Sequence, residues 1–281
     1  MSDIASSHSA MRENQKKDAP WILSWIMEYE CSQTELTTRL SLKAKLENIR
    51  GFDCSNDDWK IESVPDKNWL KESYKQFPPF SVGGFFIYGS HYDSDIPDKQ
   101  IGLQIDAATA FGSGEHGTTK GCLLAMQDLK DSGMCPWNVL DMGCGSGILA
   151  IAAWKLWLTP VLGVDIEEES IHVTTRHSNA NDIKIGASAI TCEQGDGFAA
   201  PGVQERKPFD LIIANILAGP LKDMAGDLKA VLDENGIVIL SGMLNEQADD
   251  VLKIYEGLGL NLKQRYDLDE WSTLVLQDTA A

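Results

Sequence analysis

The sequence predicts an α/β fold in which a doubly wound, mostly parallel sheet is preceded by a small N-terminal α+β domain. The first observation is a series of five short apolar runs, rich in β-branched residues, each followed by a helical stretch or a connecting loop. Apolar strands that alternate with helices are typical of a parallel sheet covered on both faces. The second observation is a glycine-rich turn directly after the first run, GCGSG at 143–147. The runs are NVLDM (138–142), VLGVD (161–165), AITCE (189–193), DLIIA (210–214) and GIVIL (236–240).

The composition fits this size and excludes several kinds of partner. The chain has 281 residues, 43% of them hydrophobic, which suits a catalytic domain of roughly 200 residues and a smaller one. Its 24 basic and 42 acidic residues give a formal charge of −18. An acidic surface repels nucleic acid phosphates and anionic lipid, so we expect no direct nucleic acid binding and no membrane association. Such a surface would attract a basic protein, although solubility alone also explains it.

Cysteine spacing and apolar segments bear on the compartment. The six cysteines have no CxxC spacing, which argues against a zinc site or a disulfide framework. The first residues lack the apolar core of a secretory signal, and no apolar run approaches the ~18 residues that a membrane span needs. We therefore expect a cytoplasmic protein with reduced cysteines and no metal, and we take a monomer as its expected state.

The N-terminal elements are less regular than the later ones. Residues 1–64 predict the small domain, and its polar start, 1–18, is expected to be disordered. DKNWLKESYKQF (66–77) predicts a short helix ended by two prolines, so a linker helix over 65–78 separates the two domains. The expected elements before this linker are a strand at 21–30, a helix at 32–51 and a strand at 59–64.

The second domain, 79–281, begins and ends with strands outside the regular series. FSVGGFFIYGS (80–90) predicts one strand, and IGLQIDA (101–107) predicts another. Near the C-terminus, residues 261–277 predict two strands joined by a short turn, which places an antiparallel strand at or near the sheet edge.

The glycine turn at 143–147 predicts a nucleoside-binding site. Glycines let the backbone approach a ligand at the carboxyl ends of the strands. Asp165 ends the next strand, 22 residues after Gly143, where a carboxylate can accept hydrogen bonds from a ribose diol. Gly145, Gly147 and Ala150 also fit the dinucleotide pattern G-x-G-x-x-A, so NAD is the alternative.

Asp141 decides between these two ligands. It stands just before the glycines, where a dinucleotide site would hold a pyrophosphate and a carboxylate would repel it. S-adenosylmethionine has no phosphate but carries an ammonium group and a sulfonium cation, and a carboxylate suits both charges. Asp141 therefore favours S-adenosylmethionine, while a turn or capping residue remains the structural alternative for it.

A second glycine-rich segment, AFGSGEHGTTKGC (110–122), lies before the first predicted strand of the series. Thr118 or Thr119 is expected to begin a helix and to cap its free N–H groups. A helix N-terminus binds anions, and the methionine part of the cofactor carries a carboxylate. FGSGEHG would then form a flap over the same ligand, with an ordinary turn before a core helix as the alternative.

Four strings together give the chain a family resemblance: AFGSGEHGTT, LDMGCGSGILAIAA, GVDIE and IIANILAGPL. The chain resembles the ribosomal protein L11 methyltransferase family of class I, Rossmann-like protein lysine methyltransferases. The resemblance implies that S-adenosylmethionine binds, that the N-terminal domain recognises the substrate, and that a basic ribosomal protein is methylated on lysine amines. The positions that carry over as cofactor-binding are Thr119, Gly143, Asp165 and Asn215, with Asp196 near the adenine. Gly145 of the glycine turn is expected to bind the cofactor as well.

Asn215 and Ile216 are the residues expected to act in the transfer. Methyl transfer is an in-line displacement that needs an uncharged amine, and lysine with a pKa near ~10.4 is protonated at neutral pH. The Asn215 side-chain oxygen and the Ile216 backbone carbonyl can accept hydrogen bonds from the amine and align its lone pair. A strand-ending turn residue is the alternative for Asn215. Alternatives for the whole chain are a lysine methyltransferase of another protein, such as an electron transfer flavoprotein β-subunit, and an inert cofactor-binding scaffold.

Overall fold

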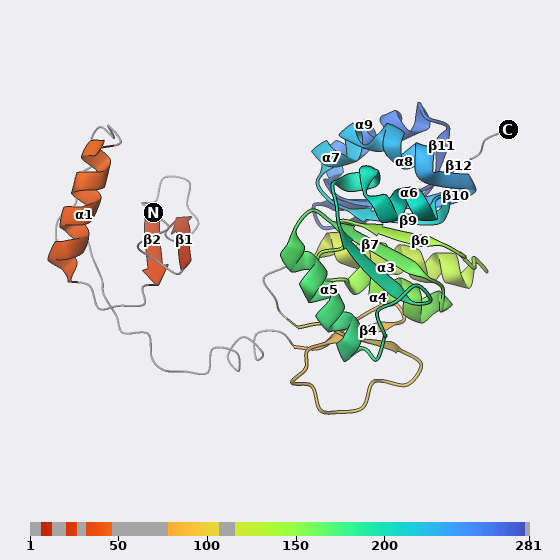
Figure 1. Cartoon of the computed structure of the whole chain (residues 1–281), viewed down its shortest axis with the longest axis horizontal. Coiled ribbons are helices and arrows are strands. Elements are labelled where there is room, and N and C mark those ends of the chain that lie inside the picture. The colour runs from red at the N-terminus through yellow and green to blue at the C-terminus, as the bar shows by residue number, and fades with distance from the viewer. Residues whose placement is uncertain (1–6, 13–20, 27–31, 47–77, 107–115, 279–281) are drawn as a thin grey trace. The chain divides into compact units, whose positions relative to one another are not determined.

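The computed structural model describes residues 7–12, 21–26, 32–46, 78–106 and 116–278 (Figure 1). The chain divides into two compact units, Met1–Lys67 and Asn68–Ala281.

The smaller unit contains a two-stranded sheet and a helix. Strand β1 (Ser7–Arg12) pairs antiparallel with β2 (Trp21–Ile26), and helix α1 spans Gln33–Leu46. The strand and helix expected near 21–30 and 32–51 are therefore present over these shorter ranges. Strand β1 lies within the range 1–18 for which the sequence predicts disorder, and the other residues of that range lie outside the described residues. The strand expected at 59–64 and the linker helix at 66–77 lie outside the described residues.

The larger unit is built on a seven-stranded sheet with the order β11-β12-β10-β9-β6-β7-β8. All five predicted parallel strands are present, and β12 runs antiparallel to β10 and β11. The β11–β12 hairpin puts β11 at the sheet edge, as the sequence predicts. The strands are β6 (Val139–Met142), β7 (Val161–Asp165), β8 (Ile190–Gln194), β9 (Phe209–Asn215), β10 (Leu232–Leu244), β11 (Leu260–Leu268) and β12 (Trp271–Asp278).

Helices cover both faces of this sheet (Figure 1). Neighbouring residues of a central strand belong to different apolar cores: Val139 and Ile213 lie in one, Leu140 and Ile212 in the other. The first core is completed by α3 and α4, and the second by α6 to α9. This division confirms the doubly wound α/β fold. The helices are α3 (Gly117–Asp131), α4 (Ile148–Trp157), α5 (Glu168–Ala180), α6 (Pro201–Arg206), α7 (Ala218–Asp223), α8 (Ala225–Val231) and α9 (Asn245–Glu256).

A separate three-stranded sheet precedes the large one in the chain. Its order is β3-β4-β5, with β3 (Phe80–Val82) antiparallel to β4 (Phe85–Tyr88) and β4 parallel to β5 (Ile101–Gln104). The single strand predicted over 80–90 is thus wrong. Gly83 has φ +54° and reverses the chain, so the run forms a hairpin instead.

Gly121 in α3 provides a test of how closely this helix packs on the sheet. A Cβ added there would lie 2.2 Å from Thr273 Oγ1, which is buried on β12 and within 2.7 Å of Ser241 Oγ. We expect Gly121→Ala to lower the free energy of unfolding by about 1–3 kcal/mol, because a β-branched, hydrogen-bonded neighbour cannot move aside. Urea unfolding of the full chain measures this.

Gly226→Ala is the matched control. Gly226 also lies in a helix, α8, but an added Cβ would meet nothing within 4 Å. Here the higher helix propensity of alanine should leave stability unchanged or raise it by about 0.5–1 kcal/mol. Equal effects of the two substitutions would contradict the proposed close approach of α3 to β12.

Candidate active site

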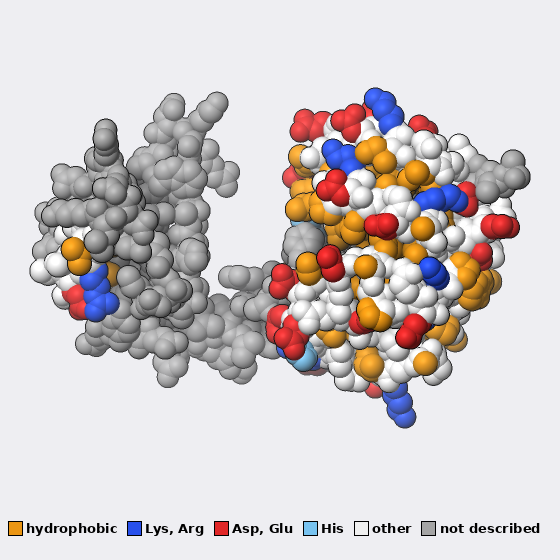
Figure 2. Space-filling view, turned by 45° about the horizontal axis from the view of Figure 1, so that its top comes forward, with side chains coloured by type: hydrophobic (Ala, Val, Ile, Leu, Met, Phe, Trp, Pro, Cys, Tyr) orange, Lys and Arg blue, Asp and Glu red, His pale blue; other side chains and the backbone are white. Residues whose placement is uncertain are grey.

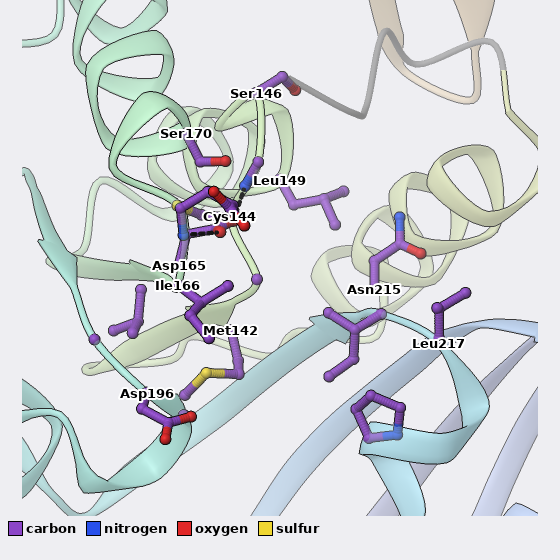
Figure 3. A pocket seen from close by; sticks show the side chains of 18 of the residues that line it. Met142, Cys144, Ser146, Leu149, Asp165, Ile166, Ser170, Asp196, Asn215 and Leu217 are labelled. Carbon is purple, nitrogen blue, oxygen red and sulfur yellow. Dashed lines mark hydrogen bonds between the residues drawn. The ribbon is translucent and has the colours of Figure 1, made fainter. Parts of the chain in front are cut away.

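A cavity of about 750 Å³ lies at the carboxyl ends of the central strands (Figure 3). Its walls are the glycine turn after β6, the end of β7, residues 195–197 after β8, and the segment from Asn215 to Met224 after β9. Strand β6 connects to β7 on one side, while its other neighbour is β9. This is the point where the strand order reverses, and ligands of doubly wound sheets bind there. The volume suits a nucleoside-sized ligand.

The glycine turn between β6 and α4 approaches β9 more closely than any side chain would allow. Gly143, Gly145 and Gly147 have φ values of +76°, +54° and +79°. A Cβ added at Gly143 would lie 2.4 Å from Cγ2 of Ile216. The backbone of the turn therefore faces the cavity directly, as the sequence predicts for Gly143 and Gly145.

Asp165 lies at the tip of β7 and lines the cavity. Its Oδ2 accepts a hydrogen bond from the Gly145 N–H at 2.9 Å, and its Oδ1 accepts one from the Glu167 N–H at 3.0 Å. These two bonds fix the orientation of the carboxylate at the rim. Each carboxylate oxygen has a second lone pair, so Asp165 can still accept hydrogen bonds from a diol.

Asp141 lies beneath the glycine turn, and it is not among the residues that line the cavity. Its carboxylate is 1% exposed, and Oδ2 accepts a hydrogen bond from the Ala150 N–H at 2.9 Å. Oδ1 has no hydrogen-bond partner among the described residues. Burial, against the opposing effect of the Ala150 bond, raises the pKa of Asp141 to about 7. The structure thus places Asp141 as a support of the turn, and a direct contact with a ligand stays a prediction.

Asn215 and Thr119 meet in the cavity, although they are 96 positions apart. The Asn215 Nδ2 donates to Thr119 Oγ1 at 3.4 Å. The Asn215 Oδ1 is buried and has no partner in the part of the chain that the structure describes. Asn215 stands across the cavity from Asp165 (Figure 3). The Asn215 side chain thus lines the cavity and carries a buried amide oxygen for which the described residues provide no donor.

The capping role predicted for a threonine at the start of α3 is wrong. The helix begins at Gly117, and its N-cap residue, His116, makes no side-chain capping hydrogen bond. The Thr118 hydroxyl instead contacts His116 Nδ1 at 2.9 Å, and the Thr119 hydroxyl faces Asn215. The His116 ring in turn packs on Trp271, with 4.5 Å between the ring centroids. Residues 107–115, which include most of the predicted flap, lie outside the described residues.

Ile216 and Asp196 both line the cavity. The Ile216 side chain forms part of the wall beside the glycine turn. Its carbonyl oxygen lies against β10, because a Cβ added at Gly242 would stand 2.2 Å from it. The Ile216 carbonyl is therefore held at the β9–β10 contact, and its predicted hydrogen bond to an amine remains untested.

Several lining residues were not predicted from the sequence. Ile166 and Leu217 each follow a predicted site residue by one or two positions and are 64% and 69% exposed, so their place after a strand end was a usable signal. Ser170 reaches the cavity from α5 and Met224 from the turn between α7 and α8, and no local motif marks them. Among the described residues there is no cluster of side chains suited to a metal ion, and no helix long and apolar enough to cross a membrane.

The sequence model of the ribosomal protein L11 methyltransferase family, PrmA, matches residues 3–279. The chain belongs to this family. The L11 methyltransferase of Rhodopseudomonas palustris is 38% identical over 78% of this chain and 73% of its own length. The Rhizobium meliloti L11 methyltransferase is 39% identical over 84% of this chain and 80% of its own length. The L11 methylase structure from Lactobacillus delbrueckii has a TM-score of 0.63 and 28% identity, over 73% of this chain and 99% of its own.

These matches identify the large sheet and its helices as the Rossmann-like fold of class I methyltransferases. The cavity at the switch point of the sheet thus lies in the domain of this chain that is homologous to known L11 methyltransferases. The predicted residues that line it are Thr119, Gly143, Gly145, Asp165, Asp196, Asn215 and Ile216.

The raised pKa of Asp141 predicts a pH-dependent stability. Folded Asp141 keeps its proton up to a pH of about 7, whereas an unfolded aspartate releases it near pH ~3.9. The folded chain therefore binds more protons between these values, and its free energy of unfolding falls as the pH rises. D141N removes this dependence. As the pH rises, the free energy of unfolding of wild type should therefore fall relative to that of D141N, by up to about 1.4 kcal/mol per pH unit. Urea unfolding at intervals from about pH 4 to 7 measures the difference; parallel curves would contradict the assignment.

Proposed function

We propose that this protein transfers methyl groups from S-adenosylmethionine to lysine amines, and to N-terminal amines, of a basic ribosomal protein in the cytoplasm. The names of its relatives support L11 as that substrate. Residues 1–64 would recognise the substrate, and a linker helix at 65–78 would join them to the methyltransferase domain at 79–281.

The residues of the cavity fit the chemical groups of S-adenosylmethionine. Asp165 offers acceptors to a ribose diol, and Gly143 and Gly145 present backbone without side chains to the cavity. Asp196 lies at the cavity wall where the adenine is expected. The N-terminus of α3, with Thr119 in its first turn, suits the carboxylate of the methionine part. When bound, S-adenosylmethionine supplies an electrophilic methyl group on a sulfonium.

One observation carries the proposed chemistry, the unused acceptor of Asn215. A buried amide oxygen without a donor costs free energy. A neutral amine entering the cavity would donate an N–H to this oxygen and remove that cost. The Thr119 contact holds the Asn215 amide in place, so the amine lone pair would be aimed along one direction. Such alignment can contribute several kcal/mol to the rate.

Nothing in the cavity marks a dedicated base for the lysine proton among the described side chains. Desolvation lowers the pKa of an ammonium group, and the cavity wall contributes Met142, Leu149 and Ile216, which are apolar. Proton loss to solvent before the amine docks is then sufficient. The role of Asn215 in this proposal is to bind and orient the amine, not to take its proton.

Charge supports a basic substrate. The chain carries a formal charge of −18, and Glu167 and Glu169 line the cavity beside Asp165. On the face shown in Figure 2, basic side chains stand singly among acidic, apolar and neutral ones. A lysine-rich protein would approach this surface faster than an acidic one. Another basic protein remains the alternative substrate, and an inert scaffold would have no use for the Asn215 acceptor.

Two substitutions separate binding from transfer. We expect Asp165→Ala to weaken the binding of S-adenosylhomocysteine at least about tenfold, because two or more hydrogen bonds to a charged group are lost. We expect Asn215→Ala to lower kcat about 10- to 100-fold with little change in that affinity. Calorimetry gives the first quantity and single-turnover transfer of labelled methyl the second.

Glu168→Ala is the control for Asp165→Ala. Glu168 is a nearby acid with 74% of its side chain exposed, and it does not line the cavity. Its removal should leave both the affinity for S-adenosylhomocysteine and kcat unchanged. Unchanged turnover after Asn215→Ala would remove Asn215 from the active site.

The substrate itself is tested with ribosomal proteins from a cell that lacks this methylation. Incubation with the protein and labelled S-adenosylmethionine, followed by mass spectrometry, should place the label on lysines of L11. Label on a different protein alone would support the alternative substrate and reject L11.

A further inference from the structure

A buried histidine on α5 contacts the cofactor turn from behind. His177 is 1% exposed, and it does not line the cavity. Its Nδ1 lies 2.8 Å from the carbonyl oxygen of Ser146, between the second and third glycines of the turn. Its Nε2 accepts a hydrogen bond from the Asp106 N–H at 3.3 Å. One imidazole thus joins the turn to Asp106, two positions after the end of β5.

Only one protonation state of His177 satisfies both contacts. The Ser146 carbonyl can only accept, so Nδ1 must carry a proton. The Asp106 N–H can only donate, so Nε2 must be free of one. A doubly protonated ring would set two N–H groups against each other at Asp106. His177 is therefore a neutral ring with a defined tautomer in this structure.

Neighbouring side chains hold the same strand. The order β3-β4-β5 leaves one edge of β5 without a strand partner among the described residues. Asn181, the C-cap residue of α5, donates to the Gln104 carbonyl at 2.8 Å and accepts from the Gln104 N–H at 3.0 Å. Lys155 on α4 donates to the Gly102 carbonyl at 2.6 Å. These three side chains form a polar seam along β5, and in it His177 is the one that also contacts the cofactor turn.

We propose that His177 is a positioning residue for the cofactor, because its ring ties the Ser146 carbonyl to the end of β5 and so holds the glycine turn in its binding conformation. This inference rests on the proposed use of S-adenosylmethionine. Glycines give the turn many alternative conformations, and each must be excluded when a ligand binds. A fixed contact at Ser146, together with the Gly145–Asp165 bond at 2.9 Å, restricts the turn before binding and so reduces the conformational entropy that is lost when the ligand binds.

The same geometry makes binding sensitive to acid. Burial lowers the pKa of His177, Arg176 lowers it further, and the Ser146 contact and Asp106 oppose this. The other charged groups at the seam are Lys155 on α4 and Asp182 after α5. Below its pKa the ring would gain a proton at Nε2 and lose the Asp106 bond. The affinity for the cofactor product should then fall.

The test is calorimetry of S-adenosylhomocysteine with the full chain at about pH 8 and about pH 5.5. We expect H177A to bind about tenfold more weakly than wild type at pH 8, which corresponds to the loss of roughly one hydrogen bond. H177N keeps a donor near the Nδ1 position and should recover part of that affinity. On acidification wild type should lose more affinity than H177N, since only wild type titrates here.

H172N is the matched control. His172 lies on the same helix, and 70% of its side chain is exposed, so its removal should leave the wild-type affinity and its pH dependence intact. Urea unfolding at both pH values shows whether each variant is folded. If H177A does not fold, the comparison of H177N with wild type decides.

The outcomes separate the proposed use of S-adenosylmethionine from the proposed role of His177. No binding by wild type at pH 8 would reject the proposed use of S-adenosylmethionine itself. Binding by wild type with equal affinity in folded H177A would overturn the role of His177. Equal affinities of folded H177A and H177N at pH 8 would overturn it as well, because only H177N keeps a donor near the Ser146 carbonyl.

Discussion

The contact between the glycine turn after β6 and the tip of β9 determines the geometry of the site. A Cβ at Gly143 would lie 2.4 Å from the Ile216 side chain, and a Cβ at Gly242 would lie 2.2 Å from the Ile216 carbonyl. Ile216 is thus enclosed by two glycines, one from each neighbouring strand. This packing fixes the tip of β9 and, with it, Asn215. The glycine-turn wall and the Asn215 wall of the cavity are therefore positioned by one cluster of close contacts.

Two carboxylates of the same site have different environments, and the environments give them different tasks. Asp165 stands at the rim, where two backbone N–H groups orient it. Asp141 is buried under the turn, where one N–H contacts it and desolvation raises its pKa. Sequence position alone gives both residues the same description, an acid at a strand end. Burial makes Asp141 a structural support of the turn and leaves Asp165 facing the cavity.

The features that the sequence predicted are those that depend on local patterns. Apolar runs with glycine turns predicted the five parallel strands, and the family motifs predicted Thr119, Asp165 and Asn215 as lining residues. The hairpin turn at Gly83, the burial of Asp141 and the position of the Ile216 carbonyl were missed. Each of these depends on a backbone angle or on a partner distant in sequence. His177 is the clearest case, because its partners at Ser146 and Asp106 are 31 and 71 positions away.

The polar seam along β5 provides hydrogen-bond partners for backbone groups at an unpaired sheet edge. Unpaired N–H and C=O groups beside a helix layer would be buried without partners or would pair with another chain. Here Asn181 bonds both groups of Gln104, and Lys155 and His177 bond the positions on either side. Side chains thus replace a strand, and the small sheet is attached to α4 and α5 without extending the large one. Because α4 begins at the cofactor turn and α5 follows Asp165, the attachment connects the small sheet to both sides of the ligand site.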